Sequence, residues 1–229
     1  MMGKALKNWL TLVVLSTLAL SAGACGGSAS RRAAEDLEND PQNHYRWARE
    51  QHLRGYYKEA LESINKAIAL DPDSYLFYNE RGLIHLNAGQ ADEALVDFTM
   101  VGEINPLYTD VHNNLGATLA KLGRLDEARA EFEKVLEDPL YQYKELAHAN
   151  LGDMLFAARD YDGAISEFRK SLSIRPDYLR AHYKIGLCYQ ALGDEQRARD
   201  SFKEVVRIAP HTDEGRESQQ ILRDLDRAN

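Results

Sequence analysis

The chain of 229 residues contains little proline, little cysteine and no strand-like runs of Val, Ile and Thr. Its 6 Pro and 2 Cys are low counts for this length. The shortage of β-formers favours a fold built from helices alone. Two cysteines are too few for a disulfide framework. A hydrophobic content of 44% is nevertheless enough to build a core.

Motifs that carry catalysis or phosphate binding are also missing. The chain has no His-Glu-x-x-His pair, no paired cysteines, no glycine-rich phosphate loop and no nucleophile elbow. His112, His148 and His182 recur at one position of a repeat, which favours packing over metal binding. Cys188 is expected to be a buried, inert thiol. We therefore predict a non-enzymatic protein with no catalytic residue, no metal and no soluble cofactor.

Basic clusters are absent as well, and the formal net charge is -8. Removal of Lys4 and Lys7 by N-terminal processing would bring the net charge to -10. Phosphate groups repel an acidic chain, so this chain is expected to be a poor non-specific binder of nucleic acid, and we predict no nucleic-acid partner.

The N-terminus has the pattern of a targeting segment. Lys4 and Lys7 precede an apolar run of 12 residues at 9–20, which is too short to span about 30 Å of hydrocarbon. Small residues at 22–24 precede Cys25, which indicates a signal peptide over residues 1–24.

Ala22-Gly23-Ala24-Cys25 resembles a bacterial lipobox, with Ala22 in place of the usual Leu. An ordinary signal peptide with a chance cysteine is the alternative. The Gly- and Ser-rich residues 26–30 favour the lipobox, because a flexible tether is expected after a lipid anchor. Several acyl chains on Cys25 would give stable anchoring. By resemblance to bacterial lipoproteins, Gly26 implies the outer membrane, with the protein facing the periplasm.

Small, aromatic and proline residues recur in one frame through the rest of the chain. Gly82, Gly116, Gly152 and Gly186 are separated by 34, 36 and 34 residues. Three further series keep the same spacing: Ala60, Ala94, Ala128, Ala164 and Ala198; Ile64, Phe98, Phe132, Phe168 and Phe202; and Pro72, Pro106, Pro176 and Pro210. This pattern is identified as the tetratricopeptide-repeat signature. It predicts an all-α solenoid, a right-handed superhelix of helix-turn-helix repeats.

The frame gives five repeats followed by a capping helix. The repeats are 41–74, 75–108, 109–144, 145–178 and 179–212; residues 25–40 form the lipidated tether and lead-in, and 213–229 the capping helix. The small residues let paired helices approach closely, and the aromatic residue fills the space between repeats. Four repeats carry Gly at the turn between their helices, whereas Arg159 stands there in the fourth. We expect that turn to be built differently.

The first helix of each repeat should line the inner wall, where positions 2, 5, 9 and 12 face a ligand. The candidate partner-binding residues are Leu76, Asn79, Leu83, Leu86, Asn113, Ala117, Phe156, Tyr183 and Leu187. Leu83 and Leu86 are the best candidates for an exposed apolar groove, because Gly82 already occupies the packing position. The alternative is that these leucines belong to the core between repeats. An exposed groove would bind a hydrophobic or amphipathic segment of another protein.

The third repeat is two residues longer than the others. Its Asn113-Asn114-Leu115-Gly116 helix and Asp138-Pro139-Leu140-Tyr141 turn precede Asn150-Leu151-Gly152. With the lipobox, this resembles the lipoprotein pilotins of type IV pilus secretins, the PilF, PilW and Tgl group. The resemblance implies a monomeric outer-membrane lipoprotein that binds secretin subunits through the inward-facing first helices. It would promote their membrane insertion or multimerisation, and so pilus biogenesis and pilus-dependent motility.

Two other interpretations remain open: a periplasmic adaptor that scaffolds cell-wall hydrolases, and a regulatory subunit of a polysaccharide export or synthesis complex. The groove hypothesis predicts that Leu83→Asp with Leu86→Asp abolishes secretin multimers while helicity stays intact.

Replacing Cys25 with Ala tests the anchor. We expect Cys25→Ala to remove the protein from the outer-membrane fraction and to reduce secretin assembly, because the acyl chains would have no attachment point. Membrane fractionation with immunoblotting measures the first effect. Full secretin assembly by the non-acylated protein would show that no anchor is needed.

Overall fold

The computed structural model describes residues 37–227, and in that range the chain forms eleven α-helices and no β-strand. The expected all-α class is therefore confirmed. The signal peptide, Cys25 and the lead-in as far as residue 36 lie outside the described residues, as do residues 228–229.

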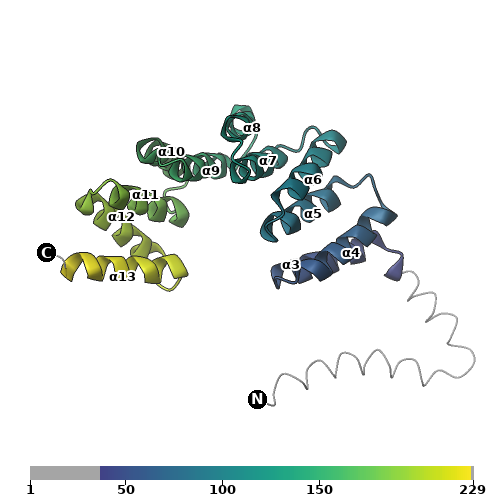
Figure 1. Ribbon diagram of the computed structural model, residues 1–229, viewed down its shortest axis with the longest axis horizontal. Helices are drawn as coiled ribbons and strands as arrows, with labels where there is room; N and C mark the ends of the chain where they lie inside the picture. Colours follow the sequence, from purple (N-terminus) through teal and green to yellow (C-terminus); the bar gives the residue numbers. More distant parts are fainter. Residues whose placement is uncertain (1–36, 228–229) are drawn as a thin grey trace, which may run out of the picture. The chain divides into compact units, whose positions relative to one another are not determined.

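Figure 1 shows that the helices come in pairs. The chain divides into two compact units after Pro72. The first unit holds α3 (Pro41–Leu53) and α4 (Tyr57–Leu70), which pack against each other. The second unit holds four further pairs and a last helix: α5 (Tyr75–Asn87) with α6 (Ala91–Ile104), α7 (Asp110–Lys121) with α8 (Leu125–Glu137), α9 (Lys144–Ala157) with α10 (Tyr161–Ile174), α11 (Leu179–Ala191) with α12 (Glu195–Ile208), and α13 (Asp213–Arg227).

Within the second unit, each helix packs against the next, and the first helices also contact one another. Contacts join α5 to α7, α7 to α9 and α9 to α11. The first helices therefore form one row, from α5 to α11. The helix α13 packs against α12, and its Ile221 and Leu222 lie against the last hydrophobic cluster. They cover apolar surface that the last repeat would otherwise expose.

A phenylalanine ring pressed against a glycine holds each pair of the second unit together. Phe98, Phe132, Phe168 and Phe202 are fully buried on the second helices. A Cβ atom built on Gly116 would lie 2.6 Å from Cε1 of Phe132, and one on Gly152 would lie 2.7 Å from Cε1 of Phe168. Real Cβ atoms do not approach this closely, so a hydrogen atom is all that fits. The periodic glycines are thus explained by packing. The aromatic rings, expected to fill the space between repeats, also fill the space within each repeat.

The turn at Arg159 corrects one expectation. Arg159 has φ of 62°, in the same left-handed region as Gly89 and Gly123, with φ of 81° and 76°. The backbone N–H of Asp160 donates to the Leu155 carbonyl at 2.9 Å, as Arg124 donates to Leu119 in the third repeat. The fourth turn is therefore built like the others. Its conformation is set by the helices it joins, and the arginine accepts the strain of a positive φ.

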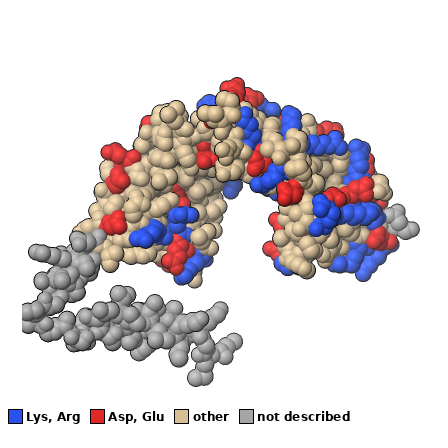
Figure 2. All heavy atoms as spheres, turned by 180° about the vertical axis from the view of Figure 1, so that it is seen from behind, with Lys and Arg blue, Asp and Glu red and all other residues tan. Residues whose placement is uncertain are grey.

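Charged side chains of both signs lie next to one another over the C-terminal helices on the face that Figure 2 shows. Several ion pairs of the C-terminal helices join residues three apart, such as Arg197 with Asp194 and Arg207 with Glu204 on or beside α12. Exposed pairs of this kind contribute little to stability, so they mark a solvated face. Among the described residues, no helix is long and apolar enough to cross a bilayer.

Exchanging Gly116 for Ala tests the ring-on-glycine contact. We expect Gly116→Ala to lower the free energy of unfolding by about 1–3 kcal/mol, because the new methyl group collides with Phe132. The higher helix propensity of Ala, about 1 kcal/mol, would not offset this. Urea unfolding followed by circular dichroism measures the change.

Gly102 on α6 supplies the matched control, since no atom lies within 4 Å of a Cβ built there. Gly102→Ala should be neutral or stabilising, by up to about 1 kcal/mol. Equal effects of the two substitutions would contradict the packing explanation.

Candidate functional site

The residues predicted to face a partner all lie on the row of first helices in the second unit. They are Leu76, Asn79, Leu83 and Leu86 on α5, Asn113 and Ala117 on α7, Phe156 on α9, and Tyr183 and Leu187 on α11. Of these nine, which all fall within the described range, only Leu76 is exposed, with 39% of its surface accessible. The row is therefore more tightly packed than the sequence pattern suggests.

Leu83 and Leu86 do not form an exposed groove, which corrects the central expectation for repeat two. Both are half-buried and pack against the cluster of Phe98, Val101 and Val111. The alternative assignment, that they belong to the core between repeats, describes them better. Asp at these positions would bury a charge beside the core, so helicity would not stay intact as expected.

Asn113 is also unavailable to a ligand. It is 7% exposed, and its Nδ2 donates to the Tyr141 hydroxyl at 3.0 Å. The tyrosine of the longer turn covers this part of α7, and sequence spacing gave no sign of that. Asn79 is half-buried, and its Oδ1 accepts a hydrogen bond from Asn114 at 3.0 Å, which joins α5 to α7.

A groove opens instead at Ala117, between α7, α8 and α9. Its volume is 270 Å³. Apolar groups supply much of the lining: Ala117, Ala120, Leu125, Phe132, Met154 and Ala157. Ala117 and Ala120 stand where repeat two carries Leu83 and Leu86, so two small side chains leave the space that two large ones fill. The change from Leu to Ala at equivalent positions is the sequence signal for this groove.

Polar side chains form the rim of this groove, namely Lys121, Asn150, Asp153 and Arg180. Arg180 forms an ion pair with Asp153, and Lys184 Nζ lies 3.5 Å from Asp153 Oδ1. Asp153 is therefore paired from within the chain, and the rim as a whole carries more positive than negative charge. An apolar side chain of a partner that enters the groove meets an uncharged floor. The polar rim can form hydrogen bonds with the partner's backbone.

Phe156, Tyr183 and Leu187 belong to the packing between the last repeats. Phe156 stacks edge-on against Tyr161 at 5.5 Å, and Tyr183 lies 6.1 Å from the Phe202 ring. Burial, followed by a hydrogen bond to Glu217, raises the pKa of Tyr183. Leu187 packs against the last hydrophobic cluster. These three side chains are half-buried, and none of them lines the groove.

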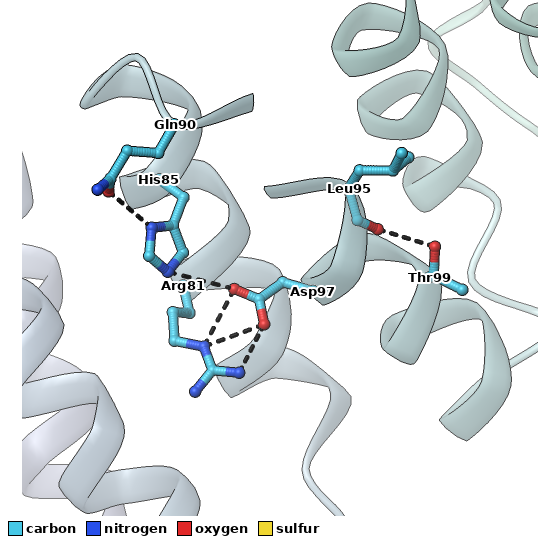
Figure 3. Close-up of polar contacts among 6 residues, drawn as sticks. All are labelled: Arg81, His85, Gln90, Leu95, Asp97 and Thr99. Carbon is cyan, nitrogen blue, oxygen red and sulfur yellow. Dashed lines mark hydrogen bonds and ion pairs between the residues drawn. The ribbon is translucent and has the colours of Figure 1, made fainter. Parts of the chain in front are cut away.

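An acid on the second helix binds a base on the first helix in three successive repeats. In repeat two, Arg81 donates to both carboxylate oxygens of the buried Asp97, and His85 lies beside them (Figure 3). His112 Nδ1 lies 2.7 Å from Glu131 Oε2, and His148 Nδ1 lies 2.8 Å from Glu167 Oε2. Histidine spacing had indicated packing alone; the acidic partners were missed because they lie 19 residues away.

The described residues contain no group of three or more His, Cys, Asp or Glu side chains placed to hold a metal ion. Cys188 is a free thiol and fully buried, and burial raises its pKa to about 12. Such a thiol is protonated at neutral pH and unreactive.

Comparison with known families gives this architecture its name. Models described as tetratricopeptide repeats match residues 42–74, 64–96, 109–138 and 144–211. The repeats are tetratricopeptide repeats. Solenoids of this kind present extended surfaces for binding other proteins, so the chain is a protein-interaction scaffold.

Among curated proteins, the chain is similar to the mouse DnaJ homolog subfamily C member 3. The two are 26% identical over 244 aligned residues, which cover 86% of this chain and 46% of the relative. The chain thus spans less than half of the length of this relative.

Two of the similar solved structures are those of proteins named PilW and PilF. PilW, described as a widely conserved type IV pilus biogenesis factor, is 23% identical with a TM-score of 0.66, covering 82% of this chain and 91% of PilW. PilF from Pseudomonas aeruginosa is 16% identical with a TM-score of 0.64, covering 82% and 89%. At these identities the likeness establishes the tetratricopeptide-repeat fold.

The pair of Glu167 and His148 makes stability depend on pH. The hydrogen bond from His148, followed by that from Lys170, holds the pKa of Glu167 below its usual range. The folded pKa thus lies below the unfolded value, so the pair stabilises the fold above the unfolded pKa of about 4.3. This contribution is lost as pH falls through the folded pKa.

We therefore expect Glu167→Gln to lower the free energy of unfolding at pH 7 and to have a smaller effect near pH 3, measured by urea unfolding. Glu133→Gln on the exposed face of α8 is the matched control and should be neutral at both pH values. A Glu167→Gln effect that is the same at both pH values would contradict the assignment.

Proposed function

We propose that this chain is an outer-membrane lipoprotein that acts as a pilotin. Lipid on Cys25 anchors the protein, and the tetratricopeptide repeats face the periplasm. The groove at Ala117 receives an apolar or amphipathic segment of a secretin subunit. Binding promotes insertion of the secretin into the outer membrane or its multimerisation, which type IV pilus biogenesis and pilus-dependent motility require.

The groove is the observation that carries this proposal. Its volume of 270 Å³ lies just below the range of about 300–1,000 Å³ for small-molecule sites. It suits one or two large apolar side chains better than a whole helix. Each buried side chain would contribute roughly 1.5–3 kcal/mol. Such binding is reversible, which an assembly factor needs because it must release its client.

The client's own chemistry fits this groove. A secretin subunit crosses the periplasm with membrane-inserting strands whose backbone groups and apolar faces lack partners until the channel closes. The apolar floor, lined by Phe132 and Met154, shields an apolar face, and Asn150 on the rim offers a hydrogen bond to the client's backbone. Neighbouring secretin subunits then displace the pilotin from this segment, because pairing between their strands satisfies every backbone group of the client.

Two further observations support the pilus assignment. The lipobox-like Ala22-Gly23-Ala24-Cys25 and the Asp138-Pro139-Leu140-Tyr141 turn resemble those of the pilotin group. PilW, which is described as a type IV pilus biogenesis factor, shares the fold over 82% of this chain. The likeness in fold supports a shared scaffold, and the sequence motifs support the specific client.

Filling the groove tests the proposal. Ala120→Leu places a larger side chain in the groove and should lower the yield of heat-resistant secretin multimers at least about tenfold, because client side chains can no longer enter. Ala130, on the exposed face of α8, offers a matched control. Ala130→Leu should leave multimers at the wild-type level.

Both variants should keep wild-type helicity by circular dichroism and wild-type localisation. Multimer formation is measured by immunoblotting of heated membrane extracts from a deletion strain that expresses each variant. Normal multimers with folded Ala120→Leu would reject the groove as the client site. Normal multimers in the deletion strain itself would reject the pilotin function.

A further inference from the structure

Two turns of the second unit share the residues Pro-Leu-Tyr and one side-chain hydrogen bond. Asn105-Pro106-Leu107-Tyr108 joins α6 to α7, and Asp138-Pro139-Leu140-Tyr141 joins α8 to α9. In each turn the first side chain accepts a hydrogen bond from the leucine N–H, at 3.3 Å for Asn105 and 2.9 Å for Asp138. The turns that follow later repeats place Asp177 and His211 after the proline instead.

The leucines of both turns point into solvent. Leu107 is 91% exposed and Leu140 is 86% exposed, so neither contributes to the core. Single exposed leucines are ordinary. Here the same residue protrudes from two equivalent turns, one at each end of the third repeat. Both turns lead from a second helix to the next first helix, so they lie on the same edge of the row.

Hydrogen bonds tie the two turns together. The Thr109 hydroxyl, two residues after Leu107, donates to Asp138 Oδ2 at 2.6 Å. The Tyr141 hydroxyl donates to Asp110 Oδ1 and receives the amide of Asn113. The two extra residues of the third repeat are therefore docked onto the start of α7. The exposed leucines belong to one continuous surface, here called the turn surface, which consists of residues 107–110 and 138–143.

A hollow of 310 Å³ lies in the turn surface, lined by Thr109, Asp110, Asp138, Leu140, Tyr141, Gln142 and Tyr143. Two carboxylates line it, and no cationic side chain does so among the described residues. The rings of Tyr141 and Tyr143 meet edge to face at 5.9 Å. Lys144 lies nearby, but its Nζ donates to the Leu136 carbonyl at 2.8 Å. Each carboxylate keeps lone pairs for a further donor.

We propose that the turn surface is a second docking site, separate from the groove, for a partner-protein segment that carries apolar side chains next to Arg or Lys. The leucines and Tyr143 bind the apolar side chains. The carboxylates of Asp110 and Asp138 bind the cation, and the tyrosine faces add cation–π attraction.

Charge complementarity favours a basic protein segment over a second copy of the chain or a membrane as the occupant of the turn surface. A second copy of the chain would bring the same carboxylates face to face, which opposes binding. An anionic membrane surface would repel them as well. A net charge of -8 attracts a basic segment to this chain from a distance. The surface therefore suits a basic, amphipathic segment of another protein.

Selection from a phage-displayed library of random peptides tests the proposal. The full mature chain is the bait, and the Leu107→Ser, Leu140→Ser double variant removes clones that bind elsewhere. We expect the remaining clones to share apolar residues alternating with Arg or Lys. Synthetic peptides from them should bind the double variant and Asp110→Asn at least about tenfold more weakly, measured by fluorescence anisotropy.

Leu53→Ser is the matched control, because Leu53 is also 85% exposed but lies on α3. It should leave the affinity for these peptides unchanged. The Ala120→Leu variant should also bind them normally, which separates this site from the groove.

Clones without basic residues, or an absence of clones that distinguish the double variant, would overturn the proposal. So would sedimentation showing a dimer that the double variant loses, or binding to phosphatidylglycerol vesicles that depends on Leu107 and Leu140. Those results would identify a second copy or a membrane as the occupant.

Discussion

The structure of the second unit depends on one contact, the phenylalanine ring that lies against a glycine of the paired helix. At Gly116 and Gly152 only a hydrogen atom fits between backbone and ring. This close approach fixes the distance between the helices of a pair, and each pair then offers its neighbours the same surface. The row formed by α5, α7, α9 and α11 follows from repeating that contact.

The candidate groove lies where the side chains on this row become smaller. In repeat two, Leu83 and Leu86 fill the space beside Phe98 and complete the core. In repeat three, Ala117 and Ala120 occupy the equivalent positions and leave a groove of 270 Å³. Both repeats pair their helices through the same glycine–phenylalanine contact, so the candidate groove results from volume that the smaller side chains leave unfilled. A scaffold of similar repeats can thus carry a candidate binding groove at one position without altering its fold.

The third repeat is distinguished a second time by its two extra residues. They extend the turn before α9, and Tyr141 docks that turn onto α7 through Asp110 and Asn113. The acid–base pairs between paired helices, such as His148 with Glu167, join the two helices of repeats two to four. The irregular turn therefore adds surface, while the regular pairs preserve the frame. Groove and turn surface lie on different parts of the same repeat.

The sequence alone determined the all-α class, the phase of the repeats and the packing role of the small Gly and Ala residues, because these depend on local periodicity. It also pointed to Ala117. Tertiary structure decided which apolar residues are available: Leu83 and Leu86 are covered, and Asn113 lies beneath Tyr141. The tertiary structure also places Arg159 in the left-handed conformation that glycine adopts in the other turns, since the paired helices impose it. The exposure and pairing of these side chains depend on residues far apart in the chain, and the spacing of the repeats does not indicate which of those residues meet.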